Sequence, residues 1–267
     1  MNNQKFRKQL NTKNLSTGFK SLDTALGQGF TNTDLIILSA RPAMGKTALA
    51  HNIALNTVFK NNKTVAIFSL EMSKNQLIQR MLFSCAEIEI QRLKTGNMRP
   101  SDWEELAKSI KEFTKVPIYI DDTAGCTAQY ISEKCHQLIS SEDSLGLIVI
   151  DYLQLMEGNN EDILKQLKTL TTELKVPVLC LSQLSRKLEK RENKRPVLDD
   201  INDKCAIEEI VDIVLFLYRD DYYTPIQDSA KSEAEIIIAK NRQNPDISKI
   251  RLEFKKDIIK FNDIKNI

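Results

Sequence analysis

Short apolar runs alternate along this chain with segments in which apolar residues recur at helical spacing. The first run, residues 35–39, does not alternate polar and apolar positions, which is typical of a strand buried on both faces of a parallel sheet. The pattern predicts strands at residues 35–39, 64–69, 117–121, 145–151, 177–182, 212–218, 235–240 and 249–254. It predicts helices at residues 46–59, 73–86, 101–113, 127–140 and 160–174, with Ser101 and Thr127 as N-caps.

Strands that alternate with helices predict an α/β fold with a doubly wound, mostly parallel sheet and ligands at the carboxyl ends of its strands. After Val211 the helical spacing ceases, so we expect the last strands to add to one edge in antiparallel order. The chain has no repeat, low-complexity tract or linker. We therefore predict one domain over residues 16–267, preceded by a short polar and basic arm over residues 1–15.

The amino-acid composition indicates a globular protein and argues against a zinc-bound or disulfide-bonded one. The 267 residues are 42% hydrophobic and 28% charged, as in an ordinary globular protein, and the net charge of +2 excludes a global basic field. Any contact with nucleic acid must then come from local loops. The five cysteines form no CxxC pair, which indicates reduced thiols rather than a zinc site or disulfides. Without an apolar run of transmembrane length or a signal peptide, we expect a cytoplasmic protein with no membrane contact.

The segment ARPAMGKT, residues 40–47, joins the first predicted strand to the first predicted helix. A tight loop before a helix directs free backbone N–H groups at one point, where the helix dipole favours an anion. Lys46 adds a mobile positive charge, and the Thr47 hydroxyl can ligate Mg²⁺. Ala40 replaces the first Gly of the usual pattern, and the alternative is an ordinary turn with a chance Gly-Lys-Thr. The flanking strand and helix favour a phosphate-binding P-loop.

Three further strands end in residues that a nucleoside triphosphatase needs. Asp151 follows a buried run and can hold Mg²⁺ opposite Thr47, although Asp also ends strands as ordinary turn chemistry. Glu71 follows the second strand, where a carboxylate can orient and deprotonate the attacking water; the alternative is a helix-start Glu stabilised by the dipole. Gln183 can contact the γ-phosphate, but a Gln at a strand end is nearly uninformative alone.

Ten segments occur in order along nearly the whole chain: STGFKSLD, ARPAMGKTALAHNIA, FSLEMS, RLKTG, IYIDDT, IDYLQLM, VPVLCLSQLSR, KRPVLDDI, DIVLFLYRDDYY and AEIIIAKNR. Together they resemble the ATPase domain of the bacterial replicative DNA helicase DnaB, a ring helicase with a RecA-type core. The resemblance implies a RecA-like P-loop NTPase with antiparallel edge strands and the second strand beside the P-loop strand. The family's P-loop often lacks the first Gly, which accounts for Ala40.

The resemblance implies that the chain binds and hydrolyses ATP with Mg²⁺. The residues implied to bind the nucleotide are Ala40, Arg41, Pro42, Ala43, Met44, Gly45, Lys46, Thr47 and, as a further phosphate contact, Arg80. Thr47 and Asp151 are similar to the family's Mg²⁺ residues. Glu71 is similar to its catalytic glutamate and Gln183 to its γ-phosphate sensor.

The segment IIIAKNRQNP contains two further residues with an implied role in catalysis. Lys240 and Arg242 resemble the pair that reaches into the neighbouring subunit's nucleotide. An Arg donated in this way neutralises charge that develops on the transferred phosphoryl group. Without the resemblance, a solvated hairpin tip would be the preferred interpretation of both residues.

Three features depart from the family's pattern. We expect no helical collar domain before the core, so that residues 1–15 form an arm or a remnant of the linker helix that docks on the next subunit. The stretch after IDYLQLM is shorter than the family's Arg-containing loop. The segment that resembles the main DNA-gripping loop reads INDKC, residues 201–205, where the family has Leu-Arg-Glu-Ser-Gly.

This altered loop predicts a changed grip on DNA. In the family, backbone N–H groups and one Arg contact the phosphates there. We expect Cys205 to restrict φ where Gly is usual, and Asn202 lacks the expected charge, for which Lys204 compensates by one position. The basic run RKLEKRENKR, from Arg186 to Arg195, is a candidate phosphate-facing loop, with a solvated surface loop as the alternative.

Two functions follow. The first is an ATP-driven helicase or translocase on single-stranded DNA in replication, working as a homo-oligomeric, hexameric ring with primase, a helicase loader or a separate collar protein as partners. The second is a non-unwinding, ATP-binding regulator or loader-like partner of a helicase ring. Glu71, Gln183 and Arg242 favour the first, while the altered loop and the expected lack of a collar domain favour the second. A recombinase or clock-type RecA relative also fits the fold, but it explains the ordered segments less well.

Overall fold

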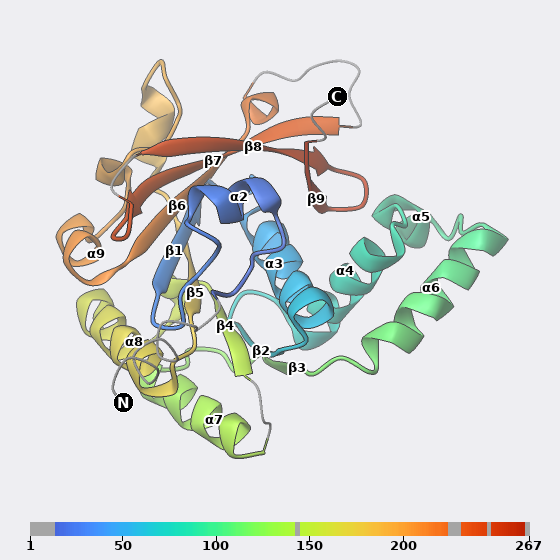
Figure 1. The fold of residues 1–267 in the computed structure, drawn as a ribbon. Helices are drawn as coiled ribbons and strands as arrows, with labels where there is room; N and C mark the ends of the chain where they lie inside the picture. The colour runs from blue at the N-terminus through green and yellow to red at the C-terminus, as the bar shows by residue number, and fades with distance from the viewer. Residues whose placement is uncertain (1–13, 142–144, 224–230, 245–246, 265–267) are drawn as a thin grey trace, which may run out of the picture.

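The strands of this protein form a single mixed sheet, with P-loop strand β1 (Leu35–Ala40) near its centre (Figure 1). The computed structural model describes residues 14–141, 145–223, 231–244 and 247–264. Within these residues the sheet has the order β3-β2-β4-β5-β1-β6-β7-β8-β9. The other strands are β2 (Thr64–Ser69), β3 (Ile118–Asp121), β4 (Leu145–Asp151), β5 (Val178–Gln183), β6 (Ile213–Tyr218), β7 (Lys231–Asn241), β8 (Ser248–Lys255) and β9 (Lys260–Asp263).

The first six strands are parallel, and the last three continue one edge in antiparallel order. This confirms the predicted fold class. The prediction that the second strand adjoins the P-loop strand is wrong, because β1 pairs with β5 and β6, and β4 and β5 separate it from β2. The connection from β1 to β2, which contains α3, passes over β5 and β4. The spacing of hydrophobic residues in a sequence does not specify how many strands such a crossover passes.

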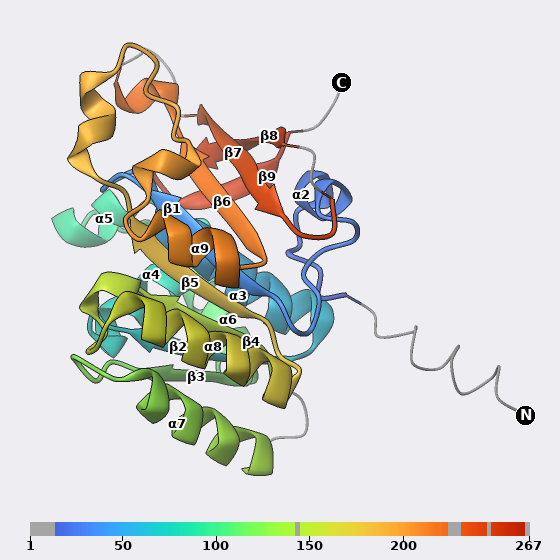
Figure 2. The same ribbon diagram turned by 90° about the vertical axis from the view of Figure 1, so that its left-hand side faces the viewer.

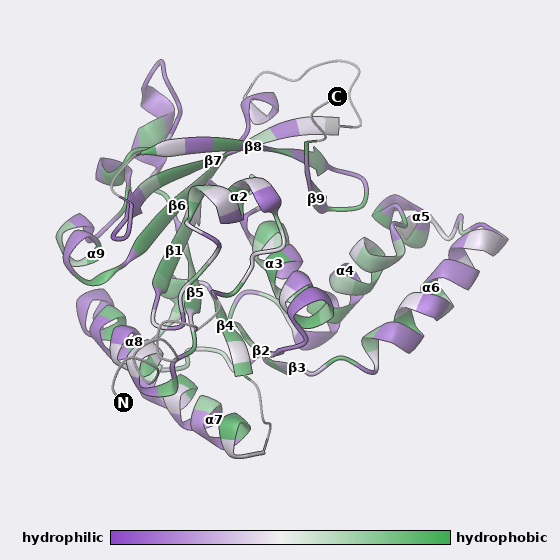
Figure 3. Cartoon of the chain, viewed as in Figure 1, coloured by the Kyte–Doolittle hydropathy of each residue, from purple (hydrophilic) through white to green (hydrophobic). Residues whose placement is uncertain are grey.

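Helices cover both faces of the sheet. One face packs against α2 (Lys20–Ala25), α3 (Lys46–Asn61) and α4 (Lys74–Ala86), and the other against α7 (Ala128–Ser141), α8 (Asn160–Leu174) and α9 (Lys204–Ile210), which Figure 2 brings to the front. In β1, Ile36 and Leu38 belong to one core and Leu35 and Ile37 to the other, as the pleat requires. Figure 3 accordingly shows green strands inside and helices with much purple outside.

All the predicted strands and helices occur, with ends shifted by a few residues. The pattern missed β9 and the short helices α2, α5 (Ile90–Thr95) and α9. Each of these spans too few residues for a period to be recognised. Helix α6 (Pro100–Phe113) packs on α4 and projects from the body of the molecule (Figure 1).

One predicted helix cap is confirmed and the other is wrong. The Thr127 hydroxyl accepts a hydrogen bond from the backbone N–H of Tyr130 at 3.1 Å, as an N-cap does. Ser101 lies inside α6, which begins at Pro100 with Arg99 as N-cap. Proline is suited to the first helical position because the N–H that it lacks would have no intrahelical acceptor.

The predicted N-terminal arm over residues 1–15 lies almost wholly outside the described residues. Leu15, at its end, is buried and forms an antiparallel bridge with Phe30, so the described chain joins the core from this residue onward. Within the described parts of the chain, no helix is long and apolar enough to cross a bilayer.

A buried histidine on α3 should make folding stability depend on pH. His51 is 4% exposed, and its Nε2 atom has no hydrogen-bond partner among the described residues. Burial, together with the nearby charge of Arg80, lowers the pKa of His51 to about 4. Below its ordinary pKa of about 6.5 the unfolded chain binds a proton that the folded chain does not. The free energy of unfolding should therefore fall by about 2 kcal/mol between pH 7 and pH 5 through this group alone.

Urea unfolding at several pH values tests this expectation. The variant His51→Leu should lose less stability than the unaltered protein as the pH falls from 6.5 towards 4. His136 provides the matched control, because its imidazole is half exposed and lies 3.7 Å from a carboxylate oxygen of Glu173. An equally steep loss in His51→Leu would show that other groups govern the acid sensitivity.

Candidate active site

The loop between β1 and α3 has the conformation of an anion-binding turn. Gly45 precedes the helix with a φ of 100°, and Ala43 has a φ of 62°. A Cβ atom on Gly45 would also lie 3.2 Å from the Phe261 ring, so both the backbone angle and the space favour glycine. The first N–H groups of α3 have no acceptor within the helix, and they lie where the loop curves.

A cavity of about 880 Å³ opens beside this loop and collects most of the predicted site residues. The predicted residues that line it are Ala40, Arg41, Pro42, Ala43, Gly45, Lys46, Thr47, Glu71, Arg80 and Gln183. Met44 is buried beneath the loop and does not line the cavity. Residues from the carboxyl ends of β1, β2 and β5 thus converge on one space, although they are far apart in sequence.

Thr47 and Asp151 form a pair at the floor of the site. The Thr47 hydroxyl donates a hydrogen bond of 2.8 Å to Asp151 Oδ2, while Asp151 Oδ1 is buried without a partner among the described residues. Burial raises the pKa of Asp151, and the nearby Lys46 charge opposes that change. A hydroxyl beside an unpartnered, buried carboxylate oxygen is the donor set that suits Mg²⁺. These two residues therefore fit the predicted metal.

Lys46 lies over an aromatic ring that the sequence interpretation did not include. Its Nζ atom is 4.5 Å from the centroid of Tyr152, the residue after Asp151. Burial lowers the pKa of Lys46, while the carboxylates of Asp151 and Glu71 act in the opposite direction. Tyr152 also lines the cavity, so this ring holds the ammonium group close to the P-loop.

Glu71 and Gln183, the two predicted residues that would contact the water and the γ-phosphate, differ in how many contacts position them. Glu71 is exposed at the cavity and makes no hydrogen bond or ion pair with any described residue. At the end of β5, the side chain of Gln154 accepts from the Gln183 backbone N–H at 3.2 Å and donates to the Ser182 hydroxyl at 2.8 Å. Gln154 thereby fixes the strand end that presents Gln183.

Arg219 is a cavity residue that sequence reasoning missed. It is 7% exposed, and its guanidinium makes two hydrogen bonds to Asp221, at 3.1 and 2.8 Å. It also lies 4.5 Å from the centroid of the Phe254 ring and donates to the carbonyl of Met44 at 3.4 Å. The segment YRDDYY was part of the resemblance, but the charge of its Arg received no role. The contact with the Met44 carbonyl indicates that Arg219 supports the backbone of the P-loop.

The side chain of Arg41 is bonded to residues outside the turn between β1 and α3. Its Nε and Nη2 atoms donate to Glu189 Oε1 at 2.9 and 2.7 Å, and Nη1 donates to the carbonyl of Leu184 at 2.8 Å. Arg41 is 7% exposed, so these bonds hold it firmly. A nucleotide would therefore meet the backbone of Arg41 rather than its guanidinium.

Lys240 and Arg242 are the predicted site residues that lie far from this cavity. Lys240 lies in the last two residues of β7 and Arg242 directly follows the strand, where Asn241 pairs with Ile213, the first residue of β6. The P-loop follows the last residue of β1, which is parallel to β6, so the pair and the P-loop lie at opposite ends of the strands. Lys240 donates to carbonyls in the last turn of α9, one of them that of Ile207 at 3.3 Å, and Arg242 donates to Asp212 at 3.1 Å and to the carbonyl of Glu209.

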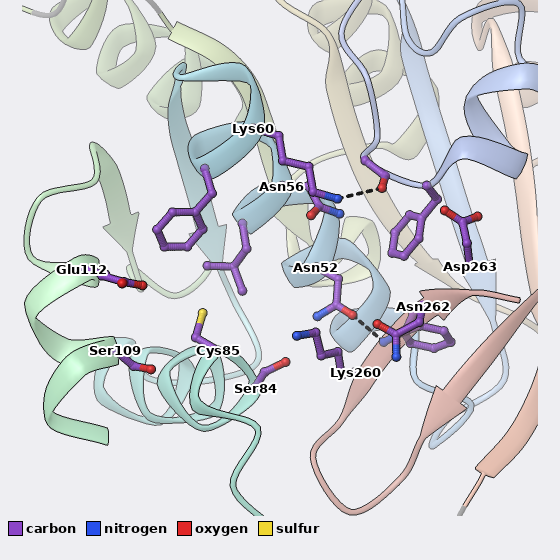
Figure 4. Close-up of a pocket in the computed structure, with 15 residues that line it drawn as sticks. Asn52, Asn56, Lys60, Ser84, Cys85, Ser109, Glu112, Lys260, Asn262 and Asp263 are labelled. Atoms are coloured by element: carbon purple, nitrogen blue, oxygen red, sulfur yellow. Dashed lines mark hydrogen bonds between the residues drawn. The ribbon is translucent and has the colours of Figure 1, made fainter. Parts of the chain in front are cut away.

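A second cavity, of about 420 Å³, lies between α3, α4, α6 and β9 (Figure 4). Its basic groups already have partners: Lys60 donates to the carbonyl of Gly18 at 2.9 Å, and Lys260 contacts Glu87 at 2.7 Å. Asn52, also shown in Figure 4, accepts from the backbone N–H of Phe261 at 2.7 Å. This cavity offers no P-loop and no unpaired lysine, so the larger cavity is the candidate nucleotide site.

The segment that resembles a DNA-gripping loop differs from its predicted conformation. Cys205 was expected to restrict φ, but it lies exposed in the first turn of α9, where any residue fits. The left-handed residue is Asp203, with a φ of 59°. Asp and Asn adopt this conformation more readily than most residues, so the turn is formed without glycine.

The lysine of the P-loop should dominate nucleotide affinity. Lys46→Ala removes one charge-assisted contact to phosphate, worth about 1.5–3 kcal/mol, so the Kd for ATP should rise about ten- to hundredfold. Isothermal calorimetry with Mg²⁺ and a non-hydrolysable ATP analogue measures the change. Lys134→Ala is the matched control, because Lys134 also lies over a tyrosine, 5.4 Å from the Tyr130 centroid, but is remote from the cavity. Equal affinities in the two variants would place the phosphates elsewhere.

Comparisons with known proteins agree with this geometry. The family described as DnaB-like helicase C terminal domain matches residues 14–263. The chain is 46% identical over 261 residues to the replicative DNA helicase DnaB of Geobacillus stearothermophilus, and 44% identical over 261 residues to the replicative DNA helicase DnaC of Bacillus subtilis. Each match covers 94% of this chain and 57% of the relative, so the chain spans little more than half the length of these relatives.

Solved structures show the same likeness. A structure described as an ATPase domain has a TM-score of 0.88 at 33% identity, covering 98% of this chain and 96% of the other. A DnaB-like replicative helicase, described together with its interactions with primase, has a TM-score of 0.89 at 32% identity. That match covers 98% of this chain and 67% of the other.

Proposed function

Because this chain belongs to the family of DnaB-like helicase C-terminal domains, we propose that it is the motor of an ATP-driven helicase or translocase that acts on single-stranded DNA in replication. Membership of the family implies nucleotide binding. The observation that supports hydrolysis as well is the convergence of Lys46, Glu71 and Gln183 on one cavity. A domain that only bound ATP would need no carboxylate there.

In the proposed reaction, the P-loop N–H groups and Lys46 hold the β- and γ-phosphates. Thr47 and Asp151 are the residues that would hold Mg²⁺, which supplies charge neutralisation at these phosphates when bound. Glu71, exposed and without a partner among the described residues, is free to accept a proton from a water near the γ-phosphate. The side-chain amide of Gln183 contacts the same phosphate, and Arg80 adds a positive charge at the cavity wall.

The distance of Lys240 and Arg242 from the cavity supports a homo-oligomeric ring, proposed as a hexamer. Neither residue can reach the nucleotide of its own chain, so both would act on that of a neighbour. We assign the ATPase domain to residues 16–267 and a linker arm to residues 1–15, of which Leu15 already packs in the core. Primase, a helicase loader or a separate collar protein would be the partners of the ring, and its location would be the cytoplasm.

A non-unwinding regulator or loader-like partner of a helicase ring is the second candidate. Lys204, the base of the altered loop, is held by Asp199 at 2.6 Å and lies 3.6 Å from Glu208. Exposed ion pairs such as these are weak, but two acidic neighbours lower the local positive potential that would attract a phosphate. This observation favours a domain whose grip on DNA has weakened.

Measurement of ATP hydrolysis with and without oligo-dT, together with the mass of the protein in ATP by light scattering, separates the two functions. The helicase proposal expects a ring whose hydrolysis is stimulated by single-stranded DNA. Hydrolysis by a ring with no response to DNA would exclude the translocase. A monomer that binds ATP without turnover would favour the regulator.

A further inference from the structure

The predicted DNA-gripping loop, residues 201–205, lies within a longer acidic segment that includes α9 and is called the acidic loop here. Residues 198–210 contain five carboxylates and one lysine. That lysine, Lys204, contacts Asp199 at 2.6 Å, and the carboxylate of Asp203 accepts a hydrogen bond from Asn160 at 2.7 Å. The exposed side chains of this acidic loop would repel a phosphate backbone. If the domain binds DNA as proposed, the positively charged contacts must come from other residues, because this segment can still offer only backbone N–H groups to a phosphate.

A basic turn lies directly beside the acidic loop. This turn, Arg186–Lys190, belongs to the connection from β5 to β6, which extends beyond the carboxyl end of β5 (Figure 2). The residues on either side of the turn bond to the acidic loop: the Ser185 N–H donates to the carbonyl of Asp200 at 3.4 Å, and Arg191 donates to the Asp200 carboxylate at 2.7 Å. A strand that passes the acidic loop would therefore be within reach of the basic turn.

The turn presents three cations that no carboxylate neutralises. Arg186, Lys187 and Lys190 are exposed and form no ion pair among the described residues. The acid of the turn, Glu189, is occupied by Arg41 at 2.7 Å. Farther along the same basic run, Arg191 and Arg195 are already paired with carboxylates. Lys194 is half-buried over the Tyr223 ring, 5.3 Å from its centroid, so the exposed cations of the run without an ion pair among the described residues are the three of the turn.

Buried contacts on its other side hold the turn in place. Leu188 is 1% exposed and packs in the core. Arg41, a residue of the P-loop, holds both Glu189 and the carbonyl of Leu184, at 2.7 and 2.8 Å. The three cations therefore lie on a segment that is attached to the P-loop on one side and to the acidic loop on the other. Side chains on a fixed backbone lose less entropy when they bind.

We propose that Arg186, Lys187 and Lys190 bind the phosphates of single-stranded DNA in place of the acidic loop. This inference rests on the proposed function, which supplies DNA as the ligand. Three phosphate contacts predict a slope of about −2 for the logarithm of affinity against that of salt concentration, at about 0.7 per contact. The attachment through Arg41 and Glu189 makes the same segment a route by which DNA affects the nucleotide site.

The experiment measures binding of fluorescent oligo-dT by anisotropy from 50 to 200 mM salt, with Mg²⁺ and a non-hydrolysable ATP analogue. The test variant combines Arg186→Gln, Lys187→Gln and Lys190→Gln. A control variant changes the same number of charges at the exposed Lys108, Lys111 and Lys115, on or next to α6. A second control is Lys204→Gln.

We expect the test variant to bind at least tenfold more weakly at 50 mM salt and to lose about two units of salt slope. Both controls should keep the unaltered slope, and the calorimetric affinity for the ATP analogue should be the same in all variants. Unchanged DNA binding by the test variant would overturn the inference and leave the proposed function standing. An unaltered protein that binds no oligo-dT would overturn both.

Discussion

Arg242→Ala should abolish most ATP turnover, by a factor of about 10³–10⁵ in kcat, while the Kd for ATP changes little. In the proposed ring, the guanidinium of one subunit neutralises charge on the phosphoryl group held by the next. Its loss therefore affects the transition state more than the bound substrate. Arg251→Ala is the control, because Arg251 is two-thirds exposed, lies 3.5 Å from Glu233 and has no proposed role at the site.

A structural cause for the loss can be separated from a catalytic one. Within its own chain Arg242 contacts Asp212, but this carboxylate also accepts from Lys168 at 2.7 Å and from the Leu35 N–H at 2.8 Å. The fold should therefore tolerate the change, which thermal unfolding can verify. A variant that folds normally and keeps turnover within a few-fold of the unaltered protein would return Arg242 to the status of a surface residue.

Glu71→Gln should lower ATP turnover by about 10²–10⁴ and leave ATP affinity intact, because an amide retains the shape of the side chain but cannot accept the proton of the attacking water. Single-turnover hydrolysis and calorimetry measure the two quantities. Glu105→Gln, at an exposed position of α6, is the matched control. Turnover that survives in Glu71→Gln would make this carboxylate a helix-start residue only.

Mixing the two inactive variants tests the ring itself. An interface between a subunit with Arg242→Ala and a neighbour with Glu71→Gln can combine an intact Glu71 from the first with an intact Arg242 from the second. Random assembly of equal amounts places such a combination at about a quarter of the interfaces, so turnover should partly recover. The recovery should depend on total concentration, as association does. No recovery at any concentration would mean that the missing group comes from another protein.

The sequence was sufficient to predict the layers of the fold and to select the residues that line the candidate phosphate site. Uninterrupted apolar runs such as residues 35–39 indicate strands covered on both faces, and long amphipathic segments indicate the helices that cover them. The strand, turn and helix of the P-loop were predictable as well, because they are consecutive in sequence. Elements of a few residues, such as α5 and β9, were missed because they contain too little of a period.

Only the tertiary structure decided which distant residues meet. The spacing of hydrophobic residues reflects only neighbours in sequence. The strand order β2-β4-β5-β1 depends instead on how many strands each crossover connection passes. That order brings Thr47 to Asp151 and places Lys240 and Arg242 at the opposite end of the strands from the P-loop. The tertiary structure also decides which charges are neutralised. In the basic run, Arg191 and Arg195 form ion pairs with carboxylates. The side chains of Arg186, Lys187 and Lys190 remain exposed. The net charge of a segment can be counted from its sequence. Which charged side chains remain free to bind a ligand depends on which groups the fold brings within contact distance.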